Sequence, residues 1–380
     1  MARILAVTWD GGGNVPPMLG IVERLRRRGH DVRVLGHEQQ RVAVEKSGAE
    51  FVAYRHARPW VGAVTHTPAR TFAMFTETGP GEDVAAELAA PVAPDLVLAD
   101  GLRLAALRAA QRLRVPTVAL MHSFHRYFTH GWARGPIGLL ATARGLRPTT
   151  LWNACDRVLV ATDSALDPAD DLPANVVYTG PVLGTPTRGD RSETPLVLVS
   201  LSTIFYPAQA AVLQNVLDGL ADLDVRVVVA VGDSVDPTAL SYRPDVDVRR
   251  FVDHDEVMST AALLVGHGGH ATTLRALSHD LPVLVVPLHP MLDQTMIGRA
   301  LADAGAGRVL STKAGPQAIR AAVRALLADD AAQAAAATCG ARIRAQDGAA
   351  EAVMEIDAVL AARGSPRDAH QRGSGTAEPR

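Results

Sequence analysis

Short apolar runs recur along the chain, and most neighbouring runs are separated by enough residues to form a helix. The runs are continuous rather than alternating, and they are rich in Val, Ile and Leu. Such runs are typical of parallel strands that are buried on both faces of a sheet. In order they are 4–7, 32–35, 96–99, 115–120, 158–160, 196–201, 225–231, 246–251, 263–265 and 282–286. The pattern predicts an α/β fold whose sheets are covered by helices.

The pattern is interrupted by a polar segment with Pro and Gly, 184–191, and then starts again. Such a segment predicts a linker between domains. We therefore expect two doubly wound, Rossmann-like domains that face each other across a cleft, with ligands at the carboxyl ends of the strands. The expected parts are a first domain at 1–184, a linker at 185–195, a second domain at 196–345, a helix at 346–363 that could return to the first domain, and a tail at 364–380. The composition of the tail predicts disorder.

The most informative motif follows the apolar run at 263–265. His267-Gly268-Gly269 leads into a predicted helix at 271–277, with Thr272 and Thr273 in its first turn. Free backbone N–H groups at a helix start, glycines that allow close approach and nearby hydroxyls suit a diphosphate, whose charge the helix dipole favours. The motif predicts an anion site.

A second polar motif follows the run at 282–286, where a short loop ends in Asp293-Gln294 before another predicted helix. A carboxylate accepts hydrogen bonds, and a carboxamide both accepts and donates them. The adjacent pair can therefore hold the neighbouring hydroxyls of a sugar.

The order of these motifs resembles the nucleotide-sugar signature of the bacterial glycosyltransferases that modify natural products such as antibiotics, macrolides and enediynes. Residues 1–36 are similar to the family's opening strand, glycine-rich turn, helix and second strand. The resemblance implies the GT-B fold, with the acceptor bound by the first domain and the nucleotide sugar by the second. It also implies inverting transfer of a sugar, favoured to be a deoxysugar, to a hydrophobic natural-product aglycone in secondary metabolism.

The resemblance assigns a set of residues to the donor. Ser202-Thr203 stands where the family has a Gly-Thr or Gly-Ser pair at the phosphates, and Phe251 matches a Trp that stacks on the nucleobase. Asp253-His254 departs from the Pro-Gln that usually follows. The implied donor residues are Ser202, Thr203, Phe251, Val252, His267, Gly268, Gly269, Ala271, Thr272, Thr273, Asp293 and Gln294.

The sugar carrier is expected to be dTDP rather than UDP. Family members that use UDP often have a Glu that binds the ribose hydroxyls, and Arg275 stands in its place here. A site without that carboxylate has no evident reason to prefer a 2′-hydroxyl.

The catalytic base is the main departure from the family. The family commonly supplies a His from the glycine-rich turn, but here Asn14 occupies that position, and a carboxamide accepts no proton at neutral pH. Asp10, His122 and His125 are the other candidates, although Asp10 could instead cap the turn. Three alternatives remain. The acceptor could need little base, or the protein could bind a donor or activate a partner without transferring a sugar. It could also be a nucleotide-sugar epimerase of the same fold.

Two segments without clear period, 54–87 and 122–150, correspond to the family's acceptor pocket. The second contains aromatic residues: Phe124, Tyr127, Phe128 and Trp132. These rings either face an apolar aglycone or pack a helical excursion against the domain.

The composition limits which partners, cofactors and cellular location we expect. The 38 Lys and Arg nearly balance 40 Asp and Glu, so nucleic acid and anionic membranes are not expected partners. Cys155 and Cys339 lack the spacing of a zinc site, and no metal or other cofactor is expected. Without a signal peptide or an apolar run of about 18 residues, we expect a soluble cytoplasmic protein, either a monomer or a homodimer.

Overall fold

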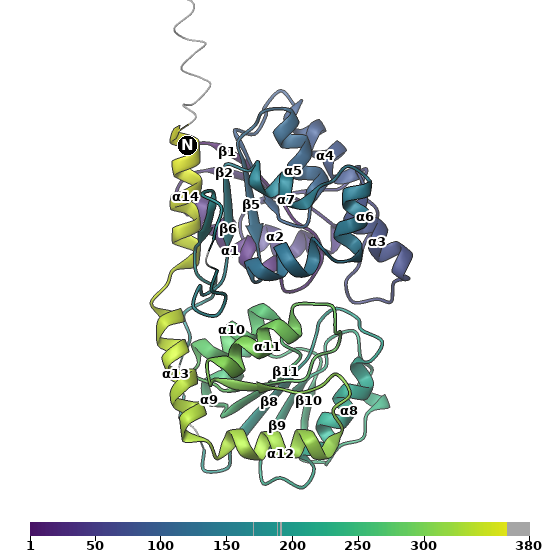
Figure 1. Ribbon diagram of the computed structural model, residues 1–380, viewed down its shortest axis with the longest axis vertical. Coiled ribbons are helices and arrows are strands. Elements are labelled where there is room, and N and C mark those ends of the chain that lie inside the picture. The colour runs from purple at the N-terminus through teal and green to yellow at the C-terminus, as the bar shows by residue number, and fades with distance from the viewer. Residues whose placement is uncertain (170, 188, 191, 363–380) are drawn as a thin grey trace, which may run out of the picture.

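The computed structural model describes residues 1–169, 171–187, 189–190 and 192–362. The tail at 364–380 lies outside the described residues. The described chain forms two α/β domains, one above the other in Figure 1. The predicted pair of doubly wound parallel sheets is confirmed.

The first domain contains a seven-stranded parallel sheet in the order β3-β2-β1-β4-β5-β6-β7. Its strands are β1 (Arg3–Val7), β2 (Asp31–Gly36), β3 (Glu50–Ala53), β4 (Leu96–Asp100), β5 (Thr117–Met121), β6 (Arg157–Val160) and β7 (Val176–Tyr178). Its helices are α1 (Val15–Arg27), α2 (Arg41–Lys46), α3 (Pro68–Thr76), α4 (Gly79–Leu88), α5 (Leu104–Arg112), α6 (Pro136–Ala143) and α7 (Pro148–Asn153). The order reverses between β1 and β4, and their carboxyl ends meet at this switch point.

The second domain contains a six-stranded parallel sheet in the order β10-β9-β8-β11-β12-β13. Its strands are β8 (Leu196–Ser200), β9 (Arg226–Ala230), β10 (Asp247–Arg249), β11 (Leu263–Gly266), β12 (Val283–Val285) and β13 (Gly307–Val309). Its helices are α8 (Gln209–Leu220), α9 (His254–Thr260), α10 (His270–Ser278), α11 (Gln294–Asp303), α12 (Pro316–Leu327) and α13 (Asp330–Arg344). Here the switch point lies between β8 and β11.

The last helix, α14 (Gly348–Ala362), leaves the second domain and packs on the first, as Figure 1 shows. Its apolar face shares a buried cluster with α1. Two ion pairs border this packing, Arg28 with Asp357 at 3.2 Å and Arg157 with Glu355 at 2.6 Å. The first domain is therefore completed by the C-terminal end of the described chain.

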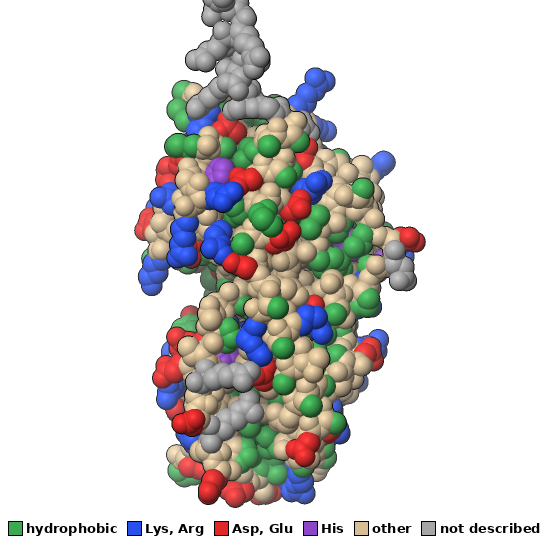
Figure 2. Space-filling model, turned by 90° about the vertical axis from the view of Figure 1, so that its left-hand side faces the viewer, with side chains coloured by type: hydrophobic (Ala, Val, Ile, Leu, Met, Phe, Trp, Pro, Cys, Tyr) green, Lys and Arg blue, Asp and Glu red, His purple; other side chains and the backbone are tan. Residues whose placement is uncertain are grey.

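The surface carries charges of both signs. Figure 2 shows Lys and Arg interspersed with Asp and Glu on one face of the molecule. Among the described helices, none is both long and apolar enough to cross a membrane.

Candidate active site

The two switch points face each other directly. Gly12, in the turn after β1, has a φ of +69°, and a Cβ there would lie 2.5 Å from Oγ1 of Thr203, which follows β8. A side chain at residue 12 would therefore be both strained and obstructed. Nearby, the backbone N–H of Phe205 donates to the carbonyl of Gly62 at 3.0 Å. The glycine-rich turn of one domain thus lies against the phosphate-site candidate Thr203 of the other.

An aspartate and a histidine meet at the carboxyl edge of the first sheet. Asp100 ends β4 and is 1% exposed, and its Oδ2 lies 3.0 Å from Nδ1 of His122, which follows β5 and is 17% exposed. Oδ1 of Asp100 accepts a hydrogen bond from the backbone N–H of Leu102 at 2.9 Å. The carboxylate is thereby fixed, and its charge lies beside Nδ1 of the imidazole, so that Nε2 is left for other chemistry.

Asp100 and His122 each favour the charged form of the other. Burial of the His122 ring acts against its charged form, but the Asp100 carboxylate, helped by Asp293, raises the pKa of His122. Burial likewise acts against the charge of Asp100, but His122 and the donated hydrogen bonds lower the pKa of this carboxyl. A base of raised pKa next to an ionised carboxylate is the arrangement of many general-base sites.

Asn14 belongs to the same cluster in a supporting position. Its Nδ2 donates to Oδ2 of Asp100 and to the carbonyl of Trp9, both at 3.0 Å, and its Oδ1 accepts from the N–H of Gly11 at 3.1 Å. The side chain is 1% exposed. Asn14 therefore closes the glycine-rich turn and orients Asp100.

The other two base candidates lie in different surroundings. Oδ2 of Asp10 accepts from the N–H of Gly62 at 2.9 Å, so this carboxylate anchors a loop to the turn. The N–H of His125 donates to the buried Asp167 at 2.5 Å, and burial lowers the pKa of the His125 ring. The structure thus brings Asn14 and His122 together, and it adds Asp100, which the sequence analysis missed.

The predicted anion site has the expected backbone. Gly268 has a φ of +84°, and a Cβ there would lie 2.7 Å from the carbonyl oxygen of Gln294. Gly269 is the N-cap of α10, and with no side chain it leaves the first-turn N–H groups to a ligand. Burial lowers the pKa of His267 to about 4, so its imidazole is neutral at pH 7 and keeps one N–H to donate. Of the two threonines, Thr272 is half-buried and Thr273 is buried.

Asp293 and Gln294 have separate surroundings. Oε1 of Gln294 accepts from the N–H groups of Leu288 at 2.7 Å and His289 at 3.0 Å, and the residue is 2% exposed. Its oxygen therefore shapes the loop before α11. Asp293 instead turns towards the first domain, where its Oδ2 accepts from the hydroxyl of Ser123 at 2.6 Å. Sequence adjacency did not reveal this division.

The remaining donor candidates differ in access. Phe251 follows β10 and is 61% exposed, so its ring face is open to a nucleobase, while Val252 beside it is half-buried. Ser202 is buried, and its Oγ accepts from the N–H of Ile204 at 3.1 Å. Arg275 lies 3.7 Å from Asp255, which partly neutralises it.

Two protein families match parts of this chain. Residues 18–180 match glycosyltransferase family 4, and residues 214–359 match the erythromycin biosynthesis protein CIII-like C-terminal domain. Between them they cover most of the chain. The 4′-demethylrebeccamycin synthase of Lentzea aerocolonigenes is 24% identical, over 94% of this chain and 100% of that relative.

Solved structures agree with the sequence relatives. The calicheamicin glycosyltransferase CalG4 is 25% identical, with a TM-score of 0.75 over 95% of this chain and 98% of that one. The chain is a glycosyltransferase of the GT-B fold and is similar to the antibiotic-type enzymes of that fold. The glycosyltransferase VinC, whose structure was determined in complex with dTDP, shares the fold at 20% identity and a TM-score of 0.69, over 95% of this chain and 100% of that one. The resemblance drawn from the sequence is confirmed.

In this glycosyltransferase the predicted acceptor rings are mostly buried. Phe128 lies edge-on to His122 at 5.5 Å, and Trp132 packs on Phe75 at 5.9 Å, which in turn packs on Trp9 at 5.1 Å. The rings therefore form an aromatic layer behind the base candidate rather than an open surface. Tyr127–Trp132 is a π-helical turn, an irregularity often found at functional sites.

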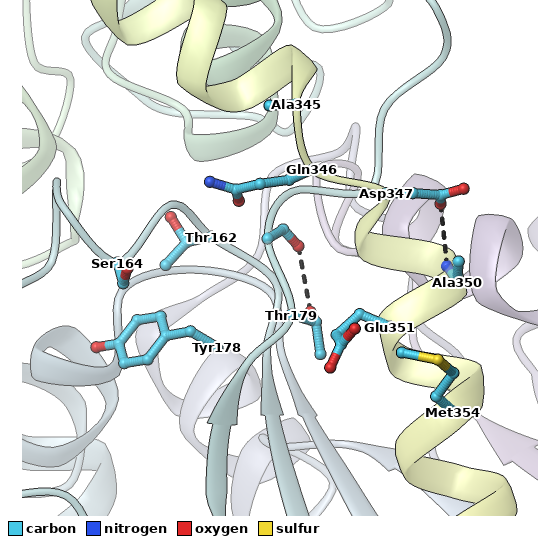
Figure 3. Close-up of a pocket in the computed structure, with 11 residues that line it drawn as sticks. Thr162, Ser164, Tyr178, Thr179, Ala345, Gln346, Asp347, Ala350, Glu351 and Met354 are labelled. Carbon is cyan, nitrogen blue, oxygen red and sulfur yellow. Dashed lines mark hydrogen bonds between the residues drawn. The ribbon is translucent and has the colours of Figure 1, made fainter.

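A cavity of about 370 Å³ lies apart from these residues, where the chain of this glycosyltransferase returns to its first domain. Figure 3 shows side chains from the start of α14, from the loop after β6 and from the end of β7 around it. Thr162, in its wall, hydrogen-bonds through Oγ1 to Nε2 of His270 in the second domain at 2.8 Å. The cavity is thus bordered by a contact between the two domains.

Proposed function

We propose that this glycosyltransferase moves a hexose from a dTDP-linked donor to a hydroxyl of a hydrophobic acceptor with inversion of configuration. We infer that the hexose is a deoxysugar. His122 is the general base in this proposal, and Asp100 orients it. The observation that carries it is the 3.0 Å contact between these two side chains at the switch point of the first sheet.

The proposed reaction is a single displacement. Nε2 of His122 takes the proton of the acceptor hydroxyl while that oxygen attacks the anomeric carbon, and the bond from this carbon to the diphosphate oxygen breaks. The departing diphosphate carries the negative charge to the first turn of α10, where N–H groups and His267 receive it. Asp100 stabilises the imidazolium that forms. One displacement inverts the anomeric configuration.

Two features support dTDP as the carrier. Arg275 stands where UDP-using family members have a carboxylate, and because a guanidinium only donates hydrogen bonds, it supplies no acceptor for a ribose 2′-hydroxyl. VinC, which has the same fold, was crystallised with dTDP. The exposed face of Phe251 suits stacking by thymine or uracil, so it does not distinguish the two bases.

The aromatic layer supports a hydrophobic acceptor. Within the described residues, the indole N–H groups of Trp9 and Trp132 are buried without a hydrogen-bond partner. Such donors are costly to bury unless a ligand can use them. Because the rings are buried behind His122, we propose that an apolar acceptor lies against the front of this layer, beside the base, rather than between the rings.

The test is transfer from matched dTDP- and UDP-linked sugars to a panel of phenolic and alcoholic aglycones, followed by NMR of the product's anomeric configuration. We expect an inverted glycoside, formed faster from the dTDP donor. Retained configuration would refute the single displacement, and a strong preference for UDP would refute the carrier assignment. Release of nucleotide that does not depend on any aglycone would argue against a transferase.

A further inference from the structure

Ser123 connects the proposed base to the second domain. It follows His122 directly in the loop after β5, is buried, and its hydroxyl donates to Oδ2 of Asp293 at 2.6 Å. Asp293 immediately precedes α11 in the other domain. The residue next to the base in the chain thus makes a hydrogen bond that crosses between the domains.

The direction of the Asp293 side chain is unusual for its position. It is the N-cap of the ten-residue helix α11, and an N-cap aspartate normally accepts hydrogen bonds from the first turn of its own helix. Among the described residues it makes no such capping bond. Its carboxylate gives up that stabilisation and points across the interface to Ser123 instead.

The charge of the Asp293 carboxylate raises the pKa of His122. Burial raises the pKa of Asp293, whereas the Ser123 hydroxyl and the charge of His122 favour its ionised form. The titratable groups that face His122 are Asp100 on β4, Asp293 at α11 and His270 on α10. Burial lowers the pKa of His270 to about 3, so it is neutral and the two carboxylates supply the charge. Tyr127 and Tyr206, which also lie near Asp293, stay protonated because burial raises the pKa of both phenols.

We propose that Ser123 is a positioning residue that keeps the Asp293 carboxylate next to the base and presents its other oxygen, Oδ1, to a hydroxyl of the donor hexose. The inference rests on the proposed function of the site. In this arrangement the Asp293 carboxylate serves both the sugar contact and the base. The binding of the donor hexose and the pKa of His122 therefore both depend on the hydrogen bond between Ser123 and Asp293.

The experiment compares Ser123→Ala with the wild-type enzyme by two readouts. The first is steady-state transfer with the dTDP-hexose varied. Loss of the hydroxyl should raise the donor KM about tenfold, the effect expected for one hydrogen bond to a charged group, and should leave the affinity for free dTDP unchanged. Ser123→Thr, which keeps the hydroxyl, should restore the KM.

The second readout is an NMR titration of ¹³C-labelled histidine in the enzyme without substrates, with the His122 signal assigned from His122→Gln. In Ser123→Ala the Asp293 carboxyl loses a bond to its ionised form, so the pKa of His122 should fall. Asp293→Asn should lower it at least as much, and adding Ser123→Ala to Asp293→Asn should lower it no further. Additive shifts from the two changes would overturn the proposal.

Thr162→Val is the matched control, because it removes another hydrogen bond between the domains without touching Asp293. It should leave the His122 titration in place, and an equal shift in this variant would overturn the proposal. An unchanged donor KM together with an unchanged titration in Ser123→Ala would do the same. If the wild-type enzyme transfers no sugar, the proposed function fails, whereas the titration still decides the link between Ser123, Asp293 and His122.

Discussion

The carboxylate of Asp100 and the imidazole of His122 lie 3.0 Å apart at the ends of two adjacent strands, β4 and β5. If His122 is the base, His122→Ala should lower kcat by the roughly 10²- to 10⁴-fold typical of a lost general base. Asp100→Asn keeps the shape but removes the charge that supports the imidazolium, so a large loss is expected there too. Single-turnover transfer measures both, and full activity of either variant would refute the pairing.

The pH dependence follows from the sign of the His122 shift. The base acts as the neutral imidazole, and its pKa is raised, so kcat should fall with decreasing pH through a midpoint above the ordinary histidine value of about 6.5. Asp100→Asn should move this midpoint to lower pH, because the neutral amide no longer favours the imidazolium. A profile of kcat against pH for the two proteins checks the direction. A midpoint that follows the pKa of the aglycone instead would indicate an acceptor that needs no base.

Asp10→Asn tests whether Asp10, rather than the pair of Asp100 and His122, provides the base. Because Oδ2 of Asp10 accepts from the N–H of Gly62, an asparagine oxygen can take the same bond. We expect kcat to change less than about tenfold, well below the cost of losing a general base. A loss of 10²-fold or more with an unchanged thermal unfolding midpoint would identify Asp10 as the base.

His267→Ala tests the anion site. The imidazole is neutral and half-buried beside the N-terminus of α10, and its loss should weaken dTDP binding by about 1 to 3 kcal/mol, the usual cost of removing a hydrogen bond to a charged group. Calorimetry with free dTDP measures it. An unaltered Kd in a folded variant would remove His267 from the diphosphate contacts.

The sequence predicted the parts of the fold that depend on local pattern. Continuous apolar runs identified most strands, because residues buried on both faces of a sheet leave no alternation. His267-Gly268-Gly269 could be placed at a helix start, since a glycine of positive φ and the following helix are encoded within a few residues.

The base could not be found in the same way. Asp100 is one carboxylate at the end of an apolar run, and only the strand order brings it beside Asn14 and His122. Its place next to the first switch point was a usable signal that the sequence analysis passed over. The orientation of the Asp293 side chain was even harder to predict from the sequence, because a residue at a helix start is expected to cap its own helix.

The return of α14 to the first domain has a consequence for chimeric enzymes. A hybrid joined between the two domains would combine one protein's first domain with another protein's α14, whose apolar face packs on α1. The mismatch would lie in the buried cluster that these two helices share. Hybrids that exchange the second domain should therefore carry residues 348–362 with the first domain and take only the intervening domain from the second parent.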